Sequence, residues 1–244
     1  MKLFSIVFIC LMVIQMAGCA TNKNKTSQNN ARREYEASKS EINTGHYAQA
    51  TVDLEHFSSK YPYSQYTIPA ELLRIFSAYK DDEFVLSEVL SKRFIDLHPG
   101  DVNIDYAEYM LAMSQYRQRT SFAKDTTENK AAIKSFKMLL KDHPNSPYAK
   151  QGRVRLQSLY NSLAKHELSI GKYYFDRDRL VAAANRFQEV VRHYQTTASI
   201  EEALYYLAAS YAKMNMPRYA RQTAQLLRYN FPNNSWSSKA EQFR

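Results

Sequence analysis

Residues 215–232 read NMPRYARQTAQLLRYNFP, and this stretch contains the features that decide the fold. Asn215 favours a turn, Ala220 is small, Leu227 is apolar, and Phe231-Pro232 closes the stretch. Four earlier segments close with a similar pair, namely Tyr61-Pro62, His98-Pro99, His143-Pro144 and Tyr194-Gln195. The recurrence indicates that one structural unit is used five times.

Alignment of the five segments on the second residue of each pair gives four consistent columns. The turn column, seventeen positions earlier, holds Gly45, Asp82, Thr127, Asp178 and Asn215. The first small column, twelve positions earlier, holds Ala50, Ser87, Ala132, Ala183 and Ala220. The apolar column, five positions earlier, holds Phe57, Phe94, Leu139, Val190 and Leu227. The second small column, eight positions later, holds Ala70, Ala107, Gly152, Ala203 and Ala240.

Each column has a physical role in a pair of packed helices. Turn and cap residues end one helix and start the next. Small residues let two helix backbones approach, apolar residues fill the space between them, and proline stops the second helix. This is the helix-turn-helix pattern of the tetratricopeptide (TPR) repeat, whose unit is about 34 residues. The columns therefore predict an all-α, TPR-like solenoid of five repeats.

Two segments are longer than a regular repeat requires. The third repeat carries about eight extra residues, which we assign to the polar loop Thr120–Asn129. The fourth carries about fourteen, in a stretch from Tyr148 to Arg177 that has apolar residues at helical spacing and no proline. That stretch predicts a bracing helix of roughly 45 Å at 1.5 Å per residue. Ser235–Phe243 is predicted to be a short capping helix.

Composition limits the other fold classes. The chain has 244 residues with only 5 Gly and 7 Pro, so a turn-rich all-β fold is disfavoured. Its hydrophobic content of 45% is ample for a core and excludes global disorder. Two cysteines are too few for a disulfide-rich scaffold or a zinc site built from cysteine.

The N-terminus has the pattern of an exported lipoprotein. Lys2 precedes an apolar run, Leu3–Ile14, that is too short to span a bilayer but fits a secretory signal. Met16-Ala17-Gly18-Cys19 resembles a bacterial lipobox, which predicts that residues 1–18 are removed and that Cys19 carries an N-palmitoyl and an S-diacylglycerol group. The alternative is an ordinary signal peptide cut near Ala20. Residues 19–30 are polar and are expected to form a flexible tether.

Charge is distributed unevenly along the predicted mature chain. Residues 19–147 hold 17 Lys and Arg against 17 Asp and Glu, whereas residues 148–244 hold 15 against 7. We therefore divide the body into N-terminal repeats, 31–147, and C-terminal repeats, 148–244. The basic half is either a solvated surface or a docking face for an acidic partner.

No motif for catalysis, metal binding or nucleic-acid binding is present. The sequence lacks a phosphate-binding glycine loop, a zinc-protease motif and a nucleophile elbow. His98 and His143 occupy the aromatic column and are expected to pack at helix ends. We predict a protein that is not an enzyme and that needs no cofactor beyond the lipid on Cys19. Nucleic acid is not expected as a partner.

Several stretches resemble the BamD/ComL family of TPR lipoproteins, which belong to the outer-membrane β-barrel assembly machinery. The stretches are Tyr61-Pro62 with Ser64 and Tyr66, Asn103-Ile104-Asp105-Tyr106 with Tyr109-Met110, residues 143–148, residues 164–174, and Asn185-Arg186. Gln195 departs from the family, which has proline there, and the Thr120–Asn129 loop is shorter than in some relatives. The resemblance covers essentially the whole chain and implies a scaffold anchored in the outer membrane of a Gram-negative bacterium, on the periplasmic side.

The resemblance also implies two working ends. The N-terminal repeats would hold a segment of an unfolded outer-membrane protein, and the candidate groove residues are Tyr63, Tyr66, Arg74, Tyr79, Asn103, Tyr106 and Tyr109. Each of these tyrosines has the alternative role of packing between helices. The C-terminal repeats would dock on a POTRA domain of a BamA-like barrel protein and on sister Bam lipoproteins. The candidate docking residues are Arg186, which matches the family's Asn-Arg pair, and Arg179, Arg192 and Arg218.

Two functions from other classes share the predicted fold and anchor. One is a lipoprotein that assembles a secretin or a pilus pore, and the other is an envelope organiser that binds peptidoglycan. The Asn103-Ile104-Asp105-Tyr106 stretch favours the assembly factor over the secretin protein.

Overall fold

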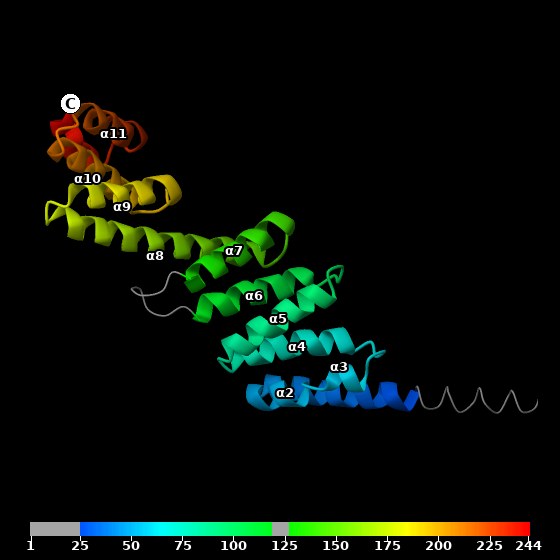
Figure 1. Ribbon diagram of the computed structural model, residues 1–244. Helices are drawn as coiled ribbons and strands as arrows, with labels where there is room; N and C mark the ends of the chain where they lie inside the picture. The colour runs from blue at the N-terminus through cyan, green and yellow to red at the C-terminus, as the bar shows by residue number, and fades with distance from the viewer. Residues whose placement is uncertain (1–24, 119–126) are drawn as a thin grey trace, which may run out of the picture. The chain divides into compact units, whose positions relative to one another are not determined.

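The computed structural model describes residues 25–118 and 127–244, and the regular elements in these ranges are all helices (Figure 1). The chain divides into two compact units, residues up to Gln118 and residues from Arg119 onward, here called unit 1 and unit 2. The expected boundary at residue 148 is therefore misplaced. The reason is that α7 (Thr127–Asp142) packs against α8 (Ala149–Phe175), so the second helix of the third repeat belongs to unit 2.

Unit 1 is a stack of helical hairpins. A helix over residues 25–43 is followed by α2 (Tyr47–Asp53), α3 (Phe57–Lys60), α4 (Thr67–Lys80), α5 (Phe84–Leu97) and α6 (Ile104–Gln118). Both α2 and α3 pack on α4, α4 packs on α5, and α5 packs on α6. The first helix corrects the tether prediction, because residues 25–30 are helical and Gln28 Nε2 donates to the Tyr63 carbonyl oxygen at 3.1 Å. Residues 1–24, including Cys19, lie outside the described ranges.

Unit 2 continues the same arrangement. After α7 and α8 come α9 (Leu180–His193), α10 (Ile200–Lys213) and α11 (Pro217–Asn230), each packed on its predecessor. The 27-residue α8 confirms the predicted long helix, and α12 (Ser235–Lys239) with the 3-10 helix η1 (Ala240–Phe243) confirms the cap. Most of the expected loop at residues 120–129 lies outside the described residues, but residues 127–129 already belong to α7.

Four of the five residues in the turn column share one backbone conformation. Gly45, Asp82, Asp178 and Asn215 all have a positive φ, between 54° and 84°. In each turn the amide of the next residue donates to a carbonyl oxygen five positions earlier, as Glu83 does to Ala78 at 3.0 Å and Met216 to Tyr211 at 2.9 Å. This is the Schellman motif, in which a left-handed residue closes a helix. Thr127, the fifth member, instead begins α7 directly after the residues that the structure does not describe.

The other columns form the core, as predicted. All members of the apolar column are buried, with at most 2% exposure. Both small columns are buried as well, and in unit 2 Ala164, Ala183 and Ala203 surround the fully buried ring of Phe187. The missing proline at Gln195 does not lengthen α9, because Tyr194 leaves helical geometry with φ −131° and the helix ends at His193.

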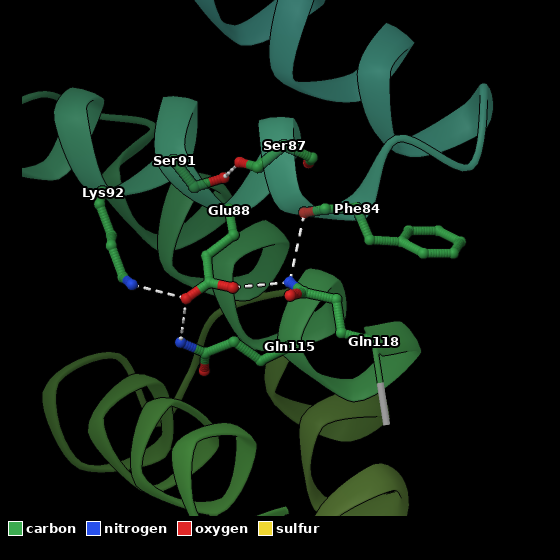
Figure 2. A network of polar contacts seen from close by, with 7 residues as sticks. All are labelled: Phe84, Ser87, Glu88, Ser91, Lys92, Gln115 and Gln118. Carbon is green, nitrogen blue, oxygen red and sulfur yellow. Dashed lines mark hydrogen bonds and ion pairs between the residues drawn. The ribbon is translucent and has the colours of Figure 1, made fainter. Parts of the chain in front are cut away.

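A polar network joins α5 to the last turn of α6 (Figure 2). Glu88 accepts hydrogen bonds from Lys92 Nζ at 2.5 Å, Gln115 Nε2 at 3.0 Å and Gln118 Nε2 at 2.6 Å. Burial alone would raise the pKa of Glu88, but the three hydrogen bonds favour the carboxylate and together hold the pKa below its usual value. Glu88 therefore fixes the C-terminal end of unit 1.

Candidate interaction surfaces

Three helices of unit 2 enclose a groove of about 1100 Å³, here called the α7–α9 groove. Since α8 contacts both α7 and α9, it lies between them and forms the floor. The α7 wall consists of Lys130, Ile133, Lys134 and Lys137. The floor, from α8, consists of Tyr160, Leu163, His166, Glu167, Ile170 and Tyr174. The α9 wall consists of Ala182, Asn185, Arg186, Glu189 and His193, with Tyr194 just beyond the helix.

The two walls differ in how their cations are used. On the α9 wall, Arg186 Nη1 lies 3.1 Å from Glu167 Oε2, and His193 Nε2 lies 3.7 Å from Glu189 Oε2. On the α7 wall the three lysines are exposed, and within residues 25–118 and 127–244 none of them makes an ion pair. Lys137 lies over the Tyr160 ring, 5.7 Å from its centroid. The uncompensated positive charge of the groove is therefore on α7.

The floor is mainly apolar and aromatic. Leu163 is 8% exposed, and the Tyr160 and Tyr194 rings lie 6.0 Å apart. Burial, followed by the negative charges of Glu189 and Glu167, raises the pKa of Tyr194. A broad groove with an apolar floor and charged walls is suited to hold a protein segment.

The structure separates the four docking candidates. Arg186 lines the α7–α9 groove, and its partner Glu167 has only 15% side-chain exposure. Arg192 is exposed in the last turn of α9, Arg179 precedes the first residue of that helix, and Arg218 is exposed on α11. These three are not among the lining residues of the groove, and their docking role remains a prediction.

None of the described cavities of unit 1 gathers the seven groove candidates, and their shared role stays a prediction. Arg74 lines a small cavity of about 230 Å³ beside Glu55, His56 and Phe94, and the other six are not among the residues that line it. The guanidinium of Arg74 already has partners within unit 1. Its Nε donates to the Thr51 carbonyl oxygen at 3.2 Å, and its Nη2 lies 3.1 Å from Glu55 Oε1. Arg74 thereby satisfies the C-terminal end of α2.

The aromatic candidates mostly pack. Tyr109 is only 9% exposed and is a core residue, so its assignment to a groove is not supported. The Tyr66 ring lies 5.2 Å from Tyr35, and the Tyr79 ring lies 5.5 Å from Phe84. Tyr106 is half-buried, and Tyr63 is 93% exposed beside the turn before α4. Packing, the alternative role for each tyrosine, therefore explains Tyr66, Tyr79 and Tyr109.

Asn103 has a local structural role. Its amide and its side-chain nitrogen both donate to Asp101 Oδ1, at 2.8 Å and 3.1 Å, just before α6 begins. Such hydrogen bonds to an aspartate stabilise the turn that leads into a helix.

Sequence reasoning missed the lysine wall of α7. Lys130, Lys134 and Lys137 have the spacing that places side chains on one helix face, so the signal was present. It was hidden because the charge count was divided at residue 148. Counted by unit, residues 25–118 hold 10 Lys and Arg against 14 Asp and Glu, whereas residues 127–244 hold 19 against 9. The described part of unit 1 is thus acidic by 4 charges, and the described part of unit 2 is basic by 10.

Neither a metal cluster nor a membrane span is found in the described part of the chain. Within it, no group of three or more His, Cys, Asp or Glu side chains is placed to hold a metal ion. The helices of the same ranges include none that is both long and apolar enough to cross a bilayer.

Comparison with known proteins shows the family of the chain. A family model described as outer membrane lipoprotein, YfiO, matches residues 27–226. The chain belongs to this family. Among curated relatives, the outer membrane protein assembly factor BamD of Pasteurella multocida is 32% identical over 239 residues, covering 94% of this chain and 92% of that protein. The BamD of Neisseria meningitidis serogroup A is 30% identical over 245 residues, with the same coverage of 94% and 92%.

Two further matches differ from these in coverage or in kind. The BamD of Rickettsia prowazekii is 31% identical over 194 residues, covering 80% of this chain and 77% of that protein. A solved structure of the TPR2AB domain of yeast Sti1 matches with a TM-score of 0.43 and 13% identity, over 87% of this chain and 83% of that one. The resemblance to the BamD/ComL family that the sequence motifs indicated is confirmed by the curated relatives.

Proposed function

We propose that this YfiO-family chain is an outer membrane protein assembly factor that acts as a scaffold and catalyses no reaction. Two curated relatives bear that name, and their alignments with this chain cover 92% of the length of each. Within the fold, the observation that carries the proposal is the α7–α9 groove, which Arg186 of the family's Asn-Arg pair lines beside Glu167 of the floor. In our proposal this groove docks a POTRA domain of a BamA-like barrel protein.

Unit 1 supplies the second part of the proposed function. Its hairpins would hold a segment of an unfolded outer-membrane protein, and Tyr63 is the candidate that is free to contact one because its ring is 93% exposed. Tyr106 is a second candidate, since it is half-buried on α6. Sister Bam lipoproteins would share the exposed basic surface of unit 2, and a lipid on Cys19 would keep both units at the outer membrane.

The test is a co-purification from the envelope. The chain carries a C-terminal tag, the envelope is solubilised in mild detergent, and the associated proteins are identified by mass spectrometry. We expect a large outer-membrane protein with POTRA domains. A secretin, or murein fragments without such a protein, would contradict the proposal and favour the corresponding alternative.

A point variant locates the docking surface. Arg186→Glu should reduce the amount of co-purified POTRA protein at least tenfold, because it places a negative charge beside Glu167 in the groove. The matched control is Arg221→Glu on α11, which makes the same charge change at an exposed residue outside the groove. Equal losses for the two variants would remove Arg186 from the docking site. Circular dichroism of both variants establishes that each is folded.

A further inference from the structure

The α7 wall has a property that Arg186 lacks. Lys130 and Lys134 are exposed, and each makes neither an ion pair nor a hydrogen bond with another described residue. Arg186 and His193 across the groove already face Glu167 and Glu189. An incoming carboxylate can pair with the lysines without displacing an existing partner, whereas at Arg186 it must compete with Glu167.

We propose that the α7 wall is the anion-recognising side of the groove and that its ligand is an acidic protein segment in extended conformation. The inference rests on the proposed docking function and names the chemistry of the partner. Lys130 and Lys134 are one helical turn apart, about 6 Å along the axis. Side chains on one face of an extended segment repeat every 6.6 Å or so. Carboxylates at alternate positions would therefore meet successive lysines of α7.

The floor accounts for the other face of such a segment. Side chains of an extended segment alternate between two faces, so apolar residues between the acids would point toward Leu163, Ile170 and Tyr160. The volume of about 1100 Å³ is enough for roughly eight residues at typical packing density. The net charge of unit 2 adds long-range attraction for an acidic segment.

The test measures peptide binding by the full mature chain in mild detergent. The probe is a fluorescent ten-residue peptide that alternates Glu and Val, followed by fluorescence anisotropy, and the reference peptide alternates Gln and Val. We expect the acidic peptide to bind at least tenfold more tightly. Raising the salt from about 0.05 M to about 0.5 M should weaken the binding, because the Debye length falls several-fold.

Two matched double variants assign the binding to the α7 wall. Lys130→Gln/Lys134→Gln should weaken binding of the acidic peptide about tenfold, as expected for the loss of two charge pairs. Lys150→Gln/Arg221→Gln removes the same charge from exposed residues outside the groove and should change binding less than twofold. Because Lys130 and Lys134 make no contact of this kind in the free protein, the fold should survive both substitutions.

Several outcomes would overturn the inference. Equal weakening in both double variants would show that the net charge, rather than the α7 wall, attracts the peptide. Binding to phosphatidylglycerol vesicles that requires Lys130 and Lys134, without binding of the acidic peptide, would assign the wall to a lipid surface. Self-association lost in the same variant would assign it to the acidic unit 1 of a second copy. If the peptide binds as expected but no POTRA protein co-purifies, the inference stands and the proposed function fails.

Discussion

Gly171 on α8 faces the ring of Phe187 on α9 so closely that a Cβ at residue 171 would lie 2.5 Å from Cε1. Both residues are buried, and the neighbours of Phe187 include Ala164 and Ala183. The contact explains how the long helix and its successor come together at the centre of unit 2. It is a position at which even one methyl group has no room.

Gly171→Ala should destabilise unit 2 by about 1–3 kcal/mol, because the Phe187 ring must shift in a close-packed core. The measurement is urea unfolding followed by circular dichroism. An unchanged midpoint would show that the ring moves freely.

Gly152→Ala is the matched control on the same helix. A Cβ there would contact Leu139 at 3.5 Å and Phe136 at 3.6 Å, which are ordinary van der Waals distances. Helix propensity favours alanine over glycine by about 1 kcal/mol, so this variant should be as stable as the wild type or more stable. Destabilisation by both variants would indicate that α8 tolerates no alanine at either glycine.

Asn215 closes α10 with a φ of 58°, which glycine adopts at no steric cost. Asn215→Gly should therefore be neutral or slightly stabilising. Asn215→Val should cost about 1–2 kcal/mol, because a β-branched residue is strained in left-handed geometry. Thermal unfolding of the two variants checks the order, and equal stabilities would contradict the Schellman assignment.

Glu88 makes the stability of unit 1 depend on pH. Its folded-state pKa is lowered, so the contribution is present above the unfolded-state pKa and is lost as the pH falls through the folded-state pKa. Glu88→Gln should be less stable than the wild type at pH near 7, by about 1–3 kcal/mol for hydrogen bonds to a charged group. This difference should shrink in acid, when the wild-type carboxylate is protonated.

The measurement compares urea unfolding of the wild type and Glu88→Gln at neutral and acidic pH. Glu83→Gln, an exposed position in the preceding turn, is the control. A gap between wild type and Glu88→Gln that stays constant across the acidic range would show that the charge of Glu88 does not stabilise the network.

Cys19→Ser should abolish incorporation of radiolabelled palmitate, because serine lacks the thiol that a lipobox cysteine provides for lipid attachment. The chain should then be depleted from the outer-membrane fraction, because the lipid that the lipobox predicts would be missing. Labelling that persists in the variant would rule out Cys19 as the modified residue.

The repeat columns predicted the core well because they report on local packing. Ala50, Phe57 and Ala70 were identified from spacing alone, and all three are buried. Steric fit between neighbouring helices leaves few residue types for such positions, so the sequence is informative there. The turn column was predicted for the same reason, since few residues accept a positive φ.

The candidate sites were predicted less well, because a tyrosine can serve either packing or contact. Tyr63 and Tyr109 looked alike in the sequence, yet one is exposed and the other is buried. The lysine wall was overlooked because its recognition requires knowing that α7 packs on α8 and belongs to unit 2. That pairing depends on tertiary contacts beyond the repeat pattern.

The packing of each helix on its immediate predecessor also has a kinetic consequence. In unit 2, α9 packs on α8, α10 on α9 and α11 on α10, so most contacts join segments that are close in sequence. Low contact order reduces the loop-closure entropy that must be overcome before native contacts form. A chain delivered from its N-terminus onward can complete each hairpin as soon as its second helix emerges, which shortens the time that its apolar columns are open to aggregation.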